Sequence, residues 1–435
     1  MPRTLGWPEA PVVLVVAFGL LACVSALARA DSTWTDHYRA ARAAYESGDF
    51  MRSRDGMALV RGMIGEQPGV AYHLARAEAR LGRADEALTL LSRYAASGMA
   101  RDVAADSAFV ALFADTTFQR LAAAAKGNRR AVGASTRLHR FAANDLLIED
   151  VAHDARTGDH YVTSVTTGAV LRLTPGGGEQ RVEALSPGNA AAFAIGFDSR
   201  RRWLWVSYAA TPTCRGYAIA DSGRSWLQAY DLDSGKVVRT LEVPRDGRPH
   251  VLGDLTVTAN GELFVTDSRQ GGLYRVAPGG RALEPWFTAD ELRGAQSPAV
   301  STDGQRVYVA QYGLGLAAVD LRSRAIRRVT FAPGIAVQGI DGLYVLDART
   351  LLAVQNGTDP QRLVRLTLDA SGTHVKGWQP IEQGTEGFAE PNHGVRVGND
   401  FVFINASGWD RVGADEQLAK DPKAPAPELR RVRLR

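Results

Sequence analysis

The chain has few cysteines, little net charge and a single long apolar run. Its 435 residues include two cysteines, Cys23 and Cys214, and the net charge is only +4. Loss of an N-terminal segment that contains Cys23 would leave one thiol, so we predict no intramolecular disulfide. The fold must then be stabilised by burial of apolar side chains, for which a chain of this length is sufficient.

The basic residues do not form the clusters that nucleic-acid binding requires. The densest run, Arg430, Arg431 and Arg433, alternates as in an edge strand, and no aromatic residues are interleaved with basic ones. We therefore expect no nucleic-acid partner.

The long apolar run lies at the N-terminus, over residues 11–27, after a short segment that contains Arg3. Ala28 and Ala30 then supply the small residues that precede a signal-peptidase site. We predict a signal peptide over residues 1–30, and hence an exported protein, periplasmic or secreted, with no stable membrane span after cleavage.

Two alternatives for this segment stay open. The run approaches the length of a membrane-spanning helix, so it could be an uncleaved anchor. Residues 20–23 read Leu-Leu-Ala-Cys, which resembles the acylation motif of lipoproteins attached at Cys23.

Residues 31–130 have helical periodicity. The segment 42–50 can be superposed on 76–85, and Gly48 and Gly82 lie 34 residues apart, which is the period of tetratricopeptide repeats. A weaker third pair is expected around Ser107–Phe113 and Thr117–Ala125, with Phe109, Phe113 and Phe118 as core candidates. We predict a tetratricopeptide-like α-helical domain, which either docks a protein partner or braces the neighbouring domain.

From residue 135 to 435 the period changes to two, and a multi-strand pattern recurs six times. The intervals range from 43 residues (Tyr161 to Leu204) to 59 residues (Leu204 to Leu263). Repeats of this length are typical of propeller blades, so the predicted fold is mainly β, a six-bladed β-propeller. The second strands of the blades begin near Tyr161, Leu204, Leu263, Val307, Leu351 and Phe401.

Three further features complete this prediction. Residues 136–141 alternate like a strand and can close the ring against residues 428–434, which removes exposed sheet edges. The longest interval is explained by an insertion at 209–225, and residues 414–427 form a surface excursion.

Ligands of a propeller gather where the innermost strands begin. These positions place two carboxylates, one carboxamide and one imidazole around the channel, an oxygen-rich set that suits calcium. They are Glu149, Phe193, Gly253, Gln296, Asp341 and His393.

Blades three to five resemble the gluconolactonase family, which includes regucalcin, the senescence marker protein. The resemblance is carried by HVLGDLTV (250–257), QSPAVSTDGQRVYVA (296–310) and IDGLYV (340–345). The resemblance covers about 290 residues of the part that runs from about Arg137 to the C-terminus. It implies a divalent-metal site that hydrolyses lactones.

Carried over residue by residue, the resemblance assigns the metal ligands to Glu149, Gln296 and Asp341, and makes Asp341 the general base. Gln296 stands where the family has a liganding asparagine, and Gly253 stands where it has a substrate-binding asparagine. His393 is a second candidate base, because its ordinary pKa lies near neutral pH. If one ion is shared, the Glu149 and Asp341 carboxylates should lie on the order of 5 Å apart.

Plainer interpretations stay open for the same residues. Asp341-Gly342 is a common turn-forming pair, Glu149 could end a strand in solvent, and His393 could simply bond a backbone carbonyl. Two functions follow: a lactone or ester hydrolase that depends on a divalent metal, with a lactone or sugar-like ligand, or a non-catalytic propeller that binds a ligand or protein through its helical repeats.

Overall fold

The computed structural model describes residues 33–289 and 292–434. The predicted signal peptide, its cleavage site and Cys23 lie outside the described residues. No helix within the described ranges is long and apolar enough to cross a membrane. The chain divides into two compact units, one that runs to Arg130 and includes Thr330–Val337 and Thr358–Pro360, and one that holds the remainder.

The first unit is helical, in agreement with the sequence. Thr33 caps its first helix in a capping box with Asp36. Gly48 and Gly82 turn the chain between helices with φ angles of 84° and 76°, which L side chains rarely adopt. The helices are α1 (Trp34–Glu46), α2 (Phe50–Ile64), α3 (Pro68–Arg80), α4 (Ala84–Ala96) and α5 (Thr116–Gly127), with the short 3₁₀ helices η1 (Val103–Ala105) and η2 (Ser107–Leu112).

The third helical pair departs from expectation in two ways. Its first member, η2, is a 3₁₀ helix of six residues, confined between the capping side chains of Asp106 and Asp115. Phe109 and Phe118 are buried as predicted, but Phe113 is 39% exposed and does not belong to the core. Helix α1 packs on α2, and α3 packs on α4.

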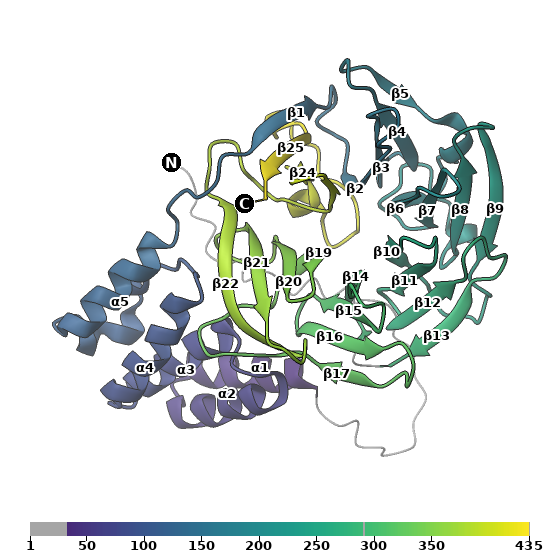
Figure 1. The fold of residues 1–435 in the computed structure, drawn as a ribbon. Coiled ribbons are helices and arrows are strands. Elements are labelled where there is room, and N and C mark those ends of the chain that lie inside the picture. Colours follow the sequence, from purple (N-terminus) through teal and green to yellow (C-terminus); the bar gives the residue numbers. More distant parts are fainter. Residues whose placement is uncertain (1–32, 290–291, 435) are drawn as a thin grey trace. The chain divides into compact units, whose positions relative to one another are not determined.

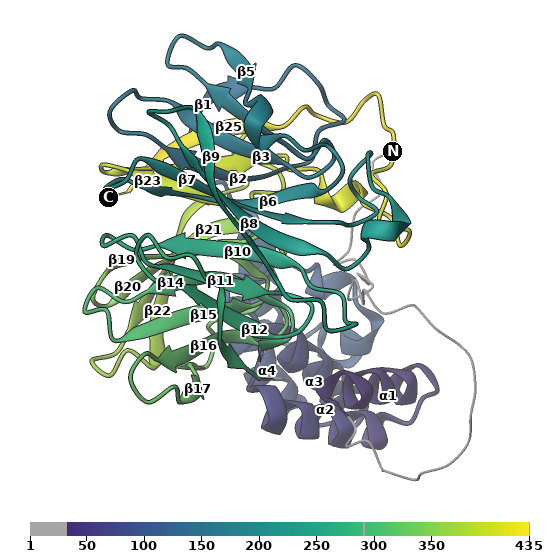
Figure 2. The ribbon, with the colours of Figure 1, turned by 90° about the vertical axis from the view of Figure 1, so that its right-hand side faces the viewer.

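The second unit is a six-bladed β-propeller, as predicted. Six antiparallel sheets surround a central axis (Figure 1), and Figure 2 shows the ring from the side. The strands of this unit are ordered, from inner to outer strand, β2-β3-β4-β5, β6-β7-β8-β9, β10-β11-β12-β13, β14-β15-β16-β17, β19-β20-β21-β22 and β23-β24-β25-β1.

The second strand of every blade begins within one residue of its predicted start. The strands of blades one to three are β2 (Ile148–His153), β3 (His160–Ser164), β4 (Ala169–Leu173), β5 (Glu179–Arg181), β6 (Ala191–Asp198), β7 (Trp203–Ala209), β8 (Ser225–Asp231), β9 (Lys236–Glu242), β10 (Leu252–Val257), β11 (Leu263–Asp267), β12 (Gly272–Val276) and β13 (Glu284–Thr288). Those of blades four to six are β14 (Ala295–Val300), β15 (Arg306–Gln311), β16 (Gly315–Asp320), β17 (Ile326–Arg328), β19 (Ile340–Asp347), β20 (Thr350–Gln355), β21 (Arg362–Leu368), β22 (His374–Gln383), β23 (Gly394–Val397), β24 (Asp400–Asn405) and β25 (Glu428–Arg433). The two-residue strand β18 (Thr330–Phe331) belongs to the first unit.

The ring closes in blade six. Strand β1 (Thr136–Arg140) pairs with β25, the last strand of the chain. Arg140 forms an ion pair of 2.7 Å with the buried Glu428. Next to this seam, Phe141 packs in a cluster that joins side chains of blade six, such as Ile404, to side chains of blade one, such as Val162.

Apolar side chains fill the space between neighbouring blades. Trp205 of blade two, which is fully buried, packs with Leu252 and Leu263 of blade three. The blades approach so closely that a Cβ at Gly196 would lie 2.5 Å from Leu255 Cδ1. This packing fixes the inner strands around the axis.

Candidate active site at the propeller axis

The inner strands are irregular where they begin. In β2, β6, β10, β14 and β19 the pairing with the second strand shifts near the start of the strand. Such bulges leave residues out of the ladder and re-aim their side chains. The shifted segments contain five of the six positions that the sequence places at the channel, namely Glu149, Phe193, Gly253, Gln296 and Asp341.

The sixth position, His393, joins three other blades at the axis. Its side chain is buried just before β23, and Nε2 lies 2.8 Å from Asp254 Oδ1 and 3.8 Å from Asp341 Oδ1. Nδ1 lies 3.3 Å from the carbonyl oxygen of Glu149. Because these residues belong to blades one, three, five and six, they meet at the centre of the ring. We call Glu149, Asp254, Asp341 and His393 the axial cluster.

Glu149 is buried and held by two donors. Nδ2 of Asn392 donates to its Oε2 at 2.9 Å, and the indole Nε1 of Trp409 donates to the same oxygen. Burial raises the pKa of Glu149 to about 8, a shift that His393 opposes and the charge of Asp341 increases. Glu149 is therefore not the solvated strand end that one interpretation allowed.

Two further carboxyl groups are buried beside it. Burial raises the pKa of Asp341, whose Oδ2 accepts a 2.6 Å hydrogen bond from Asn356 Nδ2. Burial also raises the pKa of Asp150 to about 6, although the backbone amides of Val151 and Ile195 donate to its carboxylate.

The charge of His393 is the largest influence that lowers the pKa values of Glu149, Asp150 and Asp341. Burial alone would lower the pKa of His393, but the carboxylates of Asp254 and Asp341 outweigh it and raise that pKa well above its ordinary value. An imidazolium that donates from Nδ1 to the Glu149 carbonyl and faces carboxylates with Nε2 fits these contacts. Such a group is suited to donate a proton or to stabilise negative charge, and less suited to abstract a proton.

The cluster has the donor chemistry of a cation site. Four buried carboxyl groups surround one imidazole, and Oδ1 of the fully buried Asn392 has no hydrogen-bond partner in the described structure. Carboxylate and amide oxygens are ligands that hard cations prefer. Within the described ranges, however, no three His, Cys, Asp or Glu side chains are arranged to share one ion.

The two substituted positions differ in what they offer. Gln296 is half-buried at the start of β14, between the strands that carry Asp254 and Asp341. Gly253 contributes no side chain, and the nearest atom to a Cβ built there would be Ser268 Oγ at 3.5 Å.

Sequence reasoning missed Asp254, Asn356, Asn392 and Trp409. Asp254 follows Gly253 directly, so the bulge at this point decides which of the two neighbours faces the axis. The other three lie after or before strands, and their approach depends on loop conformations that alternation does not encode.

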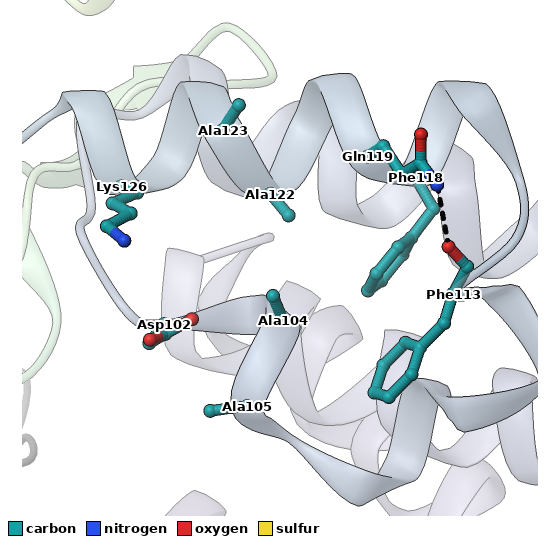
Figure 3. A pocket seen from close by; sticks show the side chains of 9 residues that line it. All are labelled: Asp102, Ala104, Ala105, Phe113, Phe118, Gln119, Ala122, Ala123 and Lys126. Atoms are coloured by element: carbon teal, nitrogen blue, oxygen red, sulfur yellow. Dashed lines mark hydrogen bonds between the residues drawn. The ribbon is translucent and has the colours of Figure 1, made fainter.

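The helical unit contains a pocket of its own, of about 540 Å³. Figure 3 shows Phe113 and Phe118 toward one end and Asp102 and Lys126 toward the other. Gln119 Nε2 donates to the carbonyl of Phe113 at 2.9 Å, which fixes the aromatic end. The exposed Phe113 thus lines a surface hollow.

No protein-family model matches the chain. No curated protein matches its sequence. Among solved structures, the chain is similar to a gluconolactonase from Xanthomonas campestris, with 16% identity, a TM-score of 0.45 and coverage of 70% of this chain and 97% of the other. It is also similar to a luciferin-regenerating enzyme, with 12% identity, a TM-score of 0.48 and coverage of 69% and 95%.

A third similar structure is virginiamycin B lyase from Staphylococcus aureus, with 11% identity, a TM-score of 0.46 and coverage of 69% and 99%. Likenesses at these values say nothing of activity. The class of the protein, a six-bladed propeller preceded by helices, is defined by its own six sheets.

Proposed function

We propose that the axial cluster is a hydrolytic site for a lactone or a related ester. The observation that carries this proposal is the position of His393, between the carboxylates of Asp254 and Asp341 and against the backbone of Glu149. A buried set of acidic groups and one imidazole, with pKa values moved from their ordinary range, is typical of acid–base catalysis.

The residues divide the proton transfers between them. Asp341 takes a proton from the water that attacks the carbonyl carbon, since its raised pKa makes it a stronger base than an ordinary aspartate. His393 stabilises the negative oxygen of the tetrahedral intermediate. As the ring C–O bond breaks, the leaving alkoxide receives a proton from Glu149, whose pKa of about 8 keeps it protonated at neutral pH. The product is a hydroxy acid.

A divalent metal such as calcium is the alternative form of this proposal, in which Glu149, Gln296 and Asp341 would be its ligands and Glu149, then ionised, would no longer serve as the proton donor. The support is the oxygen-rich cluster and the unpartnered Oδ1 of Asn392. The chemistry that such an ion supplies is polarisation of the ester carbonyl.

Replacement of Glu149 by Gln tests the proposal, because it keeps the shape and removes the carboxylate. We expect E149Q to lose bound metal, measured by elemental analysis of purified protein, and to lose turnover on a panel of five- and six-membered lactones. Glu284→Gln, at an exposed carboxylate of β13, is the matched control. Unchanged turnover in E149Q rejects the hydrolase.

A second function is a non-catalytic propeller that binds its ligand at the axis or a protein partner through the helices. It is favoured by Gly253, which offers no side chain, and by the donors from Asn356, Asn392 and Trp409 that already occupy the carboxylates. Saturable ligand binding without turnover of any lactone by the wild-type protein would select this function.

A further inference from the structure

The segment between β24 and β25 changes character at Gly408. Residues 401–408 are all buried, whereas every residue from Trp409 to Lys420 is at least partly exposed. Gly408 has a φ angle of 100°, which favours glycine, and it precedes the short 3₁₀ turn Trp409–Arg411. We call residues 408–420 the strap.

The strap is a small hairpin with its own backbone hydrogen bonds. Val412 bridges to Leu418, the amide of Gly413 donates to the carbonyl of Gln417, and the amide of Ala419 donates to the carbonyl of Arg411. This internal order lets the segment move as one piece about its ends.

The contacts of the strap cross the ring. It starts from blade six. Arg411 donates to the carbonyl of Asn144, just before blade one, and Trp409 donates to Glu149 in blade one. Gln417 donates to the carbonyl of Pro212 in the insertion of blade two. Glu416 forms an ion pair of 2.9 Å with Arg269 of blade three.

From blade six the strap thus contacts blade one, the insertion of blade two and blade three, and through Trp409 it reaches Glu149 of the axial cluster. The contacted residues all lie at the end of the blades where the inner strands begin. In blade three, for example, Arg269 closely follows Asp267, which pairs with Leu252 at the start of the inner strand β10. In Figure 1 the segment that follows β24 (yellow) extends toward the centre of the ring. The strap therefore lies on the face of the propeller where the inner strands begin, in contact with Glu149 of the axial cluster and packed against the cluster that contains the channel residue Phe193.

We propose that the strap is a movable cover that controls access to the axial cluster. Its far end is held by a partly exposed ion pair and one side-chain bond to a carbonyl, which are weak tethers. Its apolar residues Trp409, Val412 and Leu418 are only partly buried against a cluster that contains Cys214 and Phe193. Segments with few buried contacts open locally without global unfolding. The access role rests on the proposed function of the axial cluster, whereas the opening itself does not.

Cys214 provides a direct measure of opening, because it is buried beneath the strap. In full-length protein with Cys23→Ser it is the sole thiol. We expect Arg269→Ala to raise the rate of Cys214 labelling by a thiol reagent roughly three- to tenfold, since the main tether of the far end is lost. Arg156→Ala, which removes an exposed ion pair with Asp233, is the matched control and should leave the rate unchanged.

Access is measured at Glu149 itself. Carbodiimide coupling to an amine, followed by peptide mass spectrometry, should modify Glu149 faster in Arg269→Ala in step with Cys214 labelling. An unchanged labelling rate in a variant with native circular dichroism overturns the movable strap. Faster Cys214 labelling with unchanged Glu149 modification overturns its control of access. Both readouts are independent of lactone turnover, so failure here is distinct from failure of the hydrolase.

Discussion

At position 253 the backbone has room for a side chain that the sequence does not supply. The nearest atoms to a Cβ there are those of Ser268, at 3.5 and 3.7 Å, which is ordinary van der Waals contact. The resembled family has a substrate-binding asparagine at this position. An asparagine therefore fits the backbone at position 253, and the bulge in β10 decides whether its amide reaches the axial cluster.

Gly253→Asn should therefore fold normally and raise kcat/KM for lactones by roughly three- to tenfold, which is the worth of one added hydrogen bond. Steady-state kinetics on the lactone panel measure this effect. Gly253→Ala, which adds the Cβ without the amide, is the control. Equal kinetics for the two variants would show that position 253 does not face the substrate.

The sequence predicted several site residues that lie in strands, but it missed one at a bulge and others that lie outside the strands. The inner-strand positions Glu149 and Asp341 follow from alternation and repeat length, and both are buried at the axis. Asp254 was missed because one extra residue at the bulge in β10 changes which side chain turns inward. Trp409 was missed because its partner, Glu149, lies 260 residues away in the sequence. Ring closure and the conformation of a loop bring the two residues together.

The near end of the strap is anchored by Glu390, a buried residue with an unusual backbone conformation. Glu390 is buried with a φ angle of 36°, and its carboxylate accepts from the backbone amides of Gly408 and Asp410. Burial and the neighbouring charge of Asp410 raise the pKa of Glu390 to about 8. The near end of the strap is thus fixed to a carboxyl group that prefers to be protonated.

This raised pKa predicts a pH dependence of stability. At pH values between the ordinary pKa of a glutamate and about 8, Glu390 binds more protons in the folded state than in the unfolded state. The free energy of unfolding therefore falls as pH rises through this range. Glu390→Gln should reduce the loss between pH 5.5 and 8.5 by on the order of 2 kcal/mol, measured by urea unfolding. Glu284→Gln should leave the loss as in the wild type. If the stability of Glu390→Gln depended on pH as that of the wild type does, the pH dependence would arise from a group other than Glu390.

The strands of the propeller could be predicted closely, because each blade repeats the same alternation between turns. The insertion at 209–225 and the pairing of the first and last strands also agree with the structure. The helical unit was harder to predict at η2. The sequence of so short a segment between two capping residues does not determine whether an α-helix or a 3₁₀ helix forms. The exposure of Phe113 was likewise not encoded in its apolar character.

For the molecule as a whole, the ring depends on a seam made by the two ends of the propeller chain. Phe141 is 1% exposed and packs against side chains from blade six and blade one. Phe264 is equally buried, but it lies between blades three and four, away from the seam. The pair allows the energy of core packing to be separated from the effect of closure.

Phe141→Ala and Phe264→Ala should each lower the free energy of unfolding by about 3–5 kcal/mol, measured by urea denaturation. At equal stability, only Phe141→Ala should also aggregate as the protein concentration rises. A loosened seam would expose the edges of β1 and β25, which pair with each other in the closed ring. Light scattering across a concentration series measures the difference. Equal scattering by the two variants would mean that the seam has no special role, and that the ring is held as firmly by any of its six interfaces.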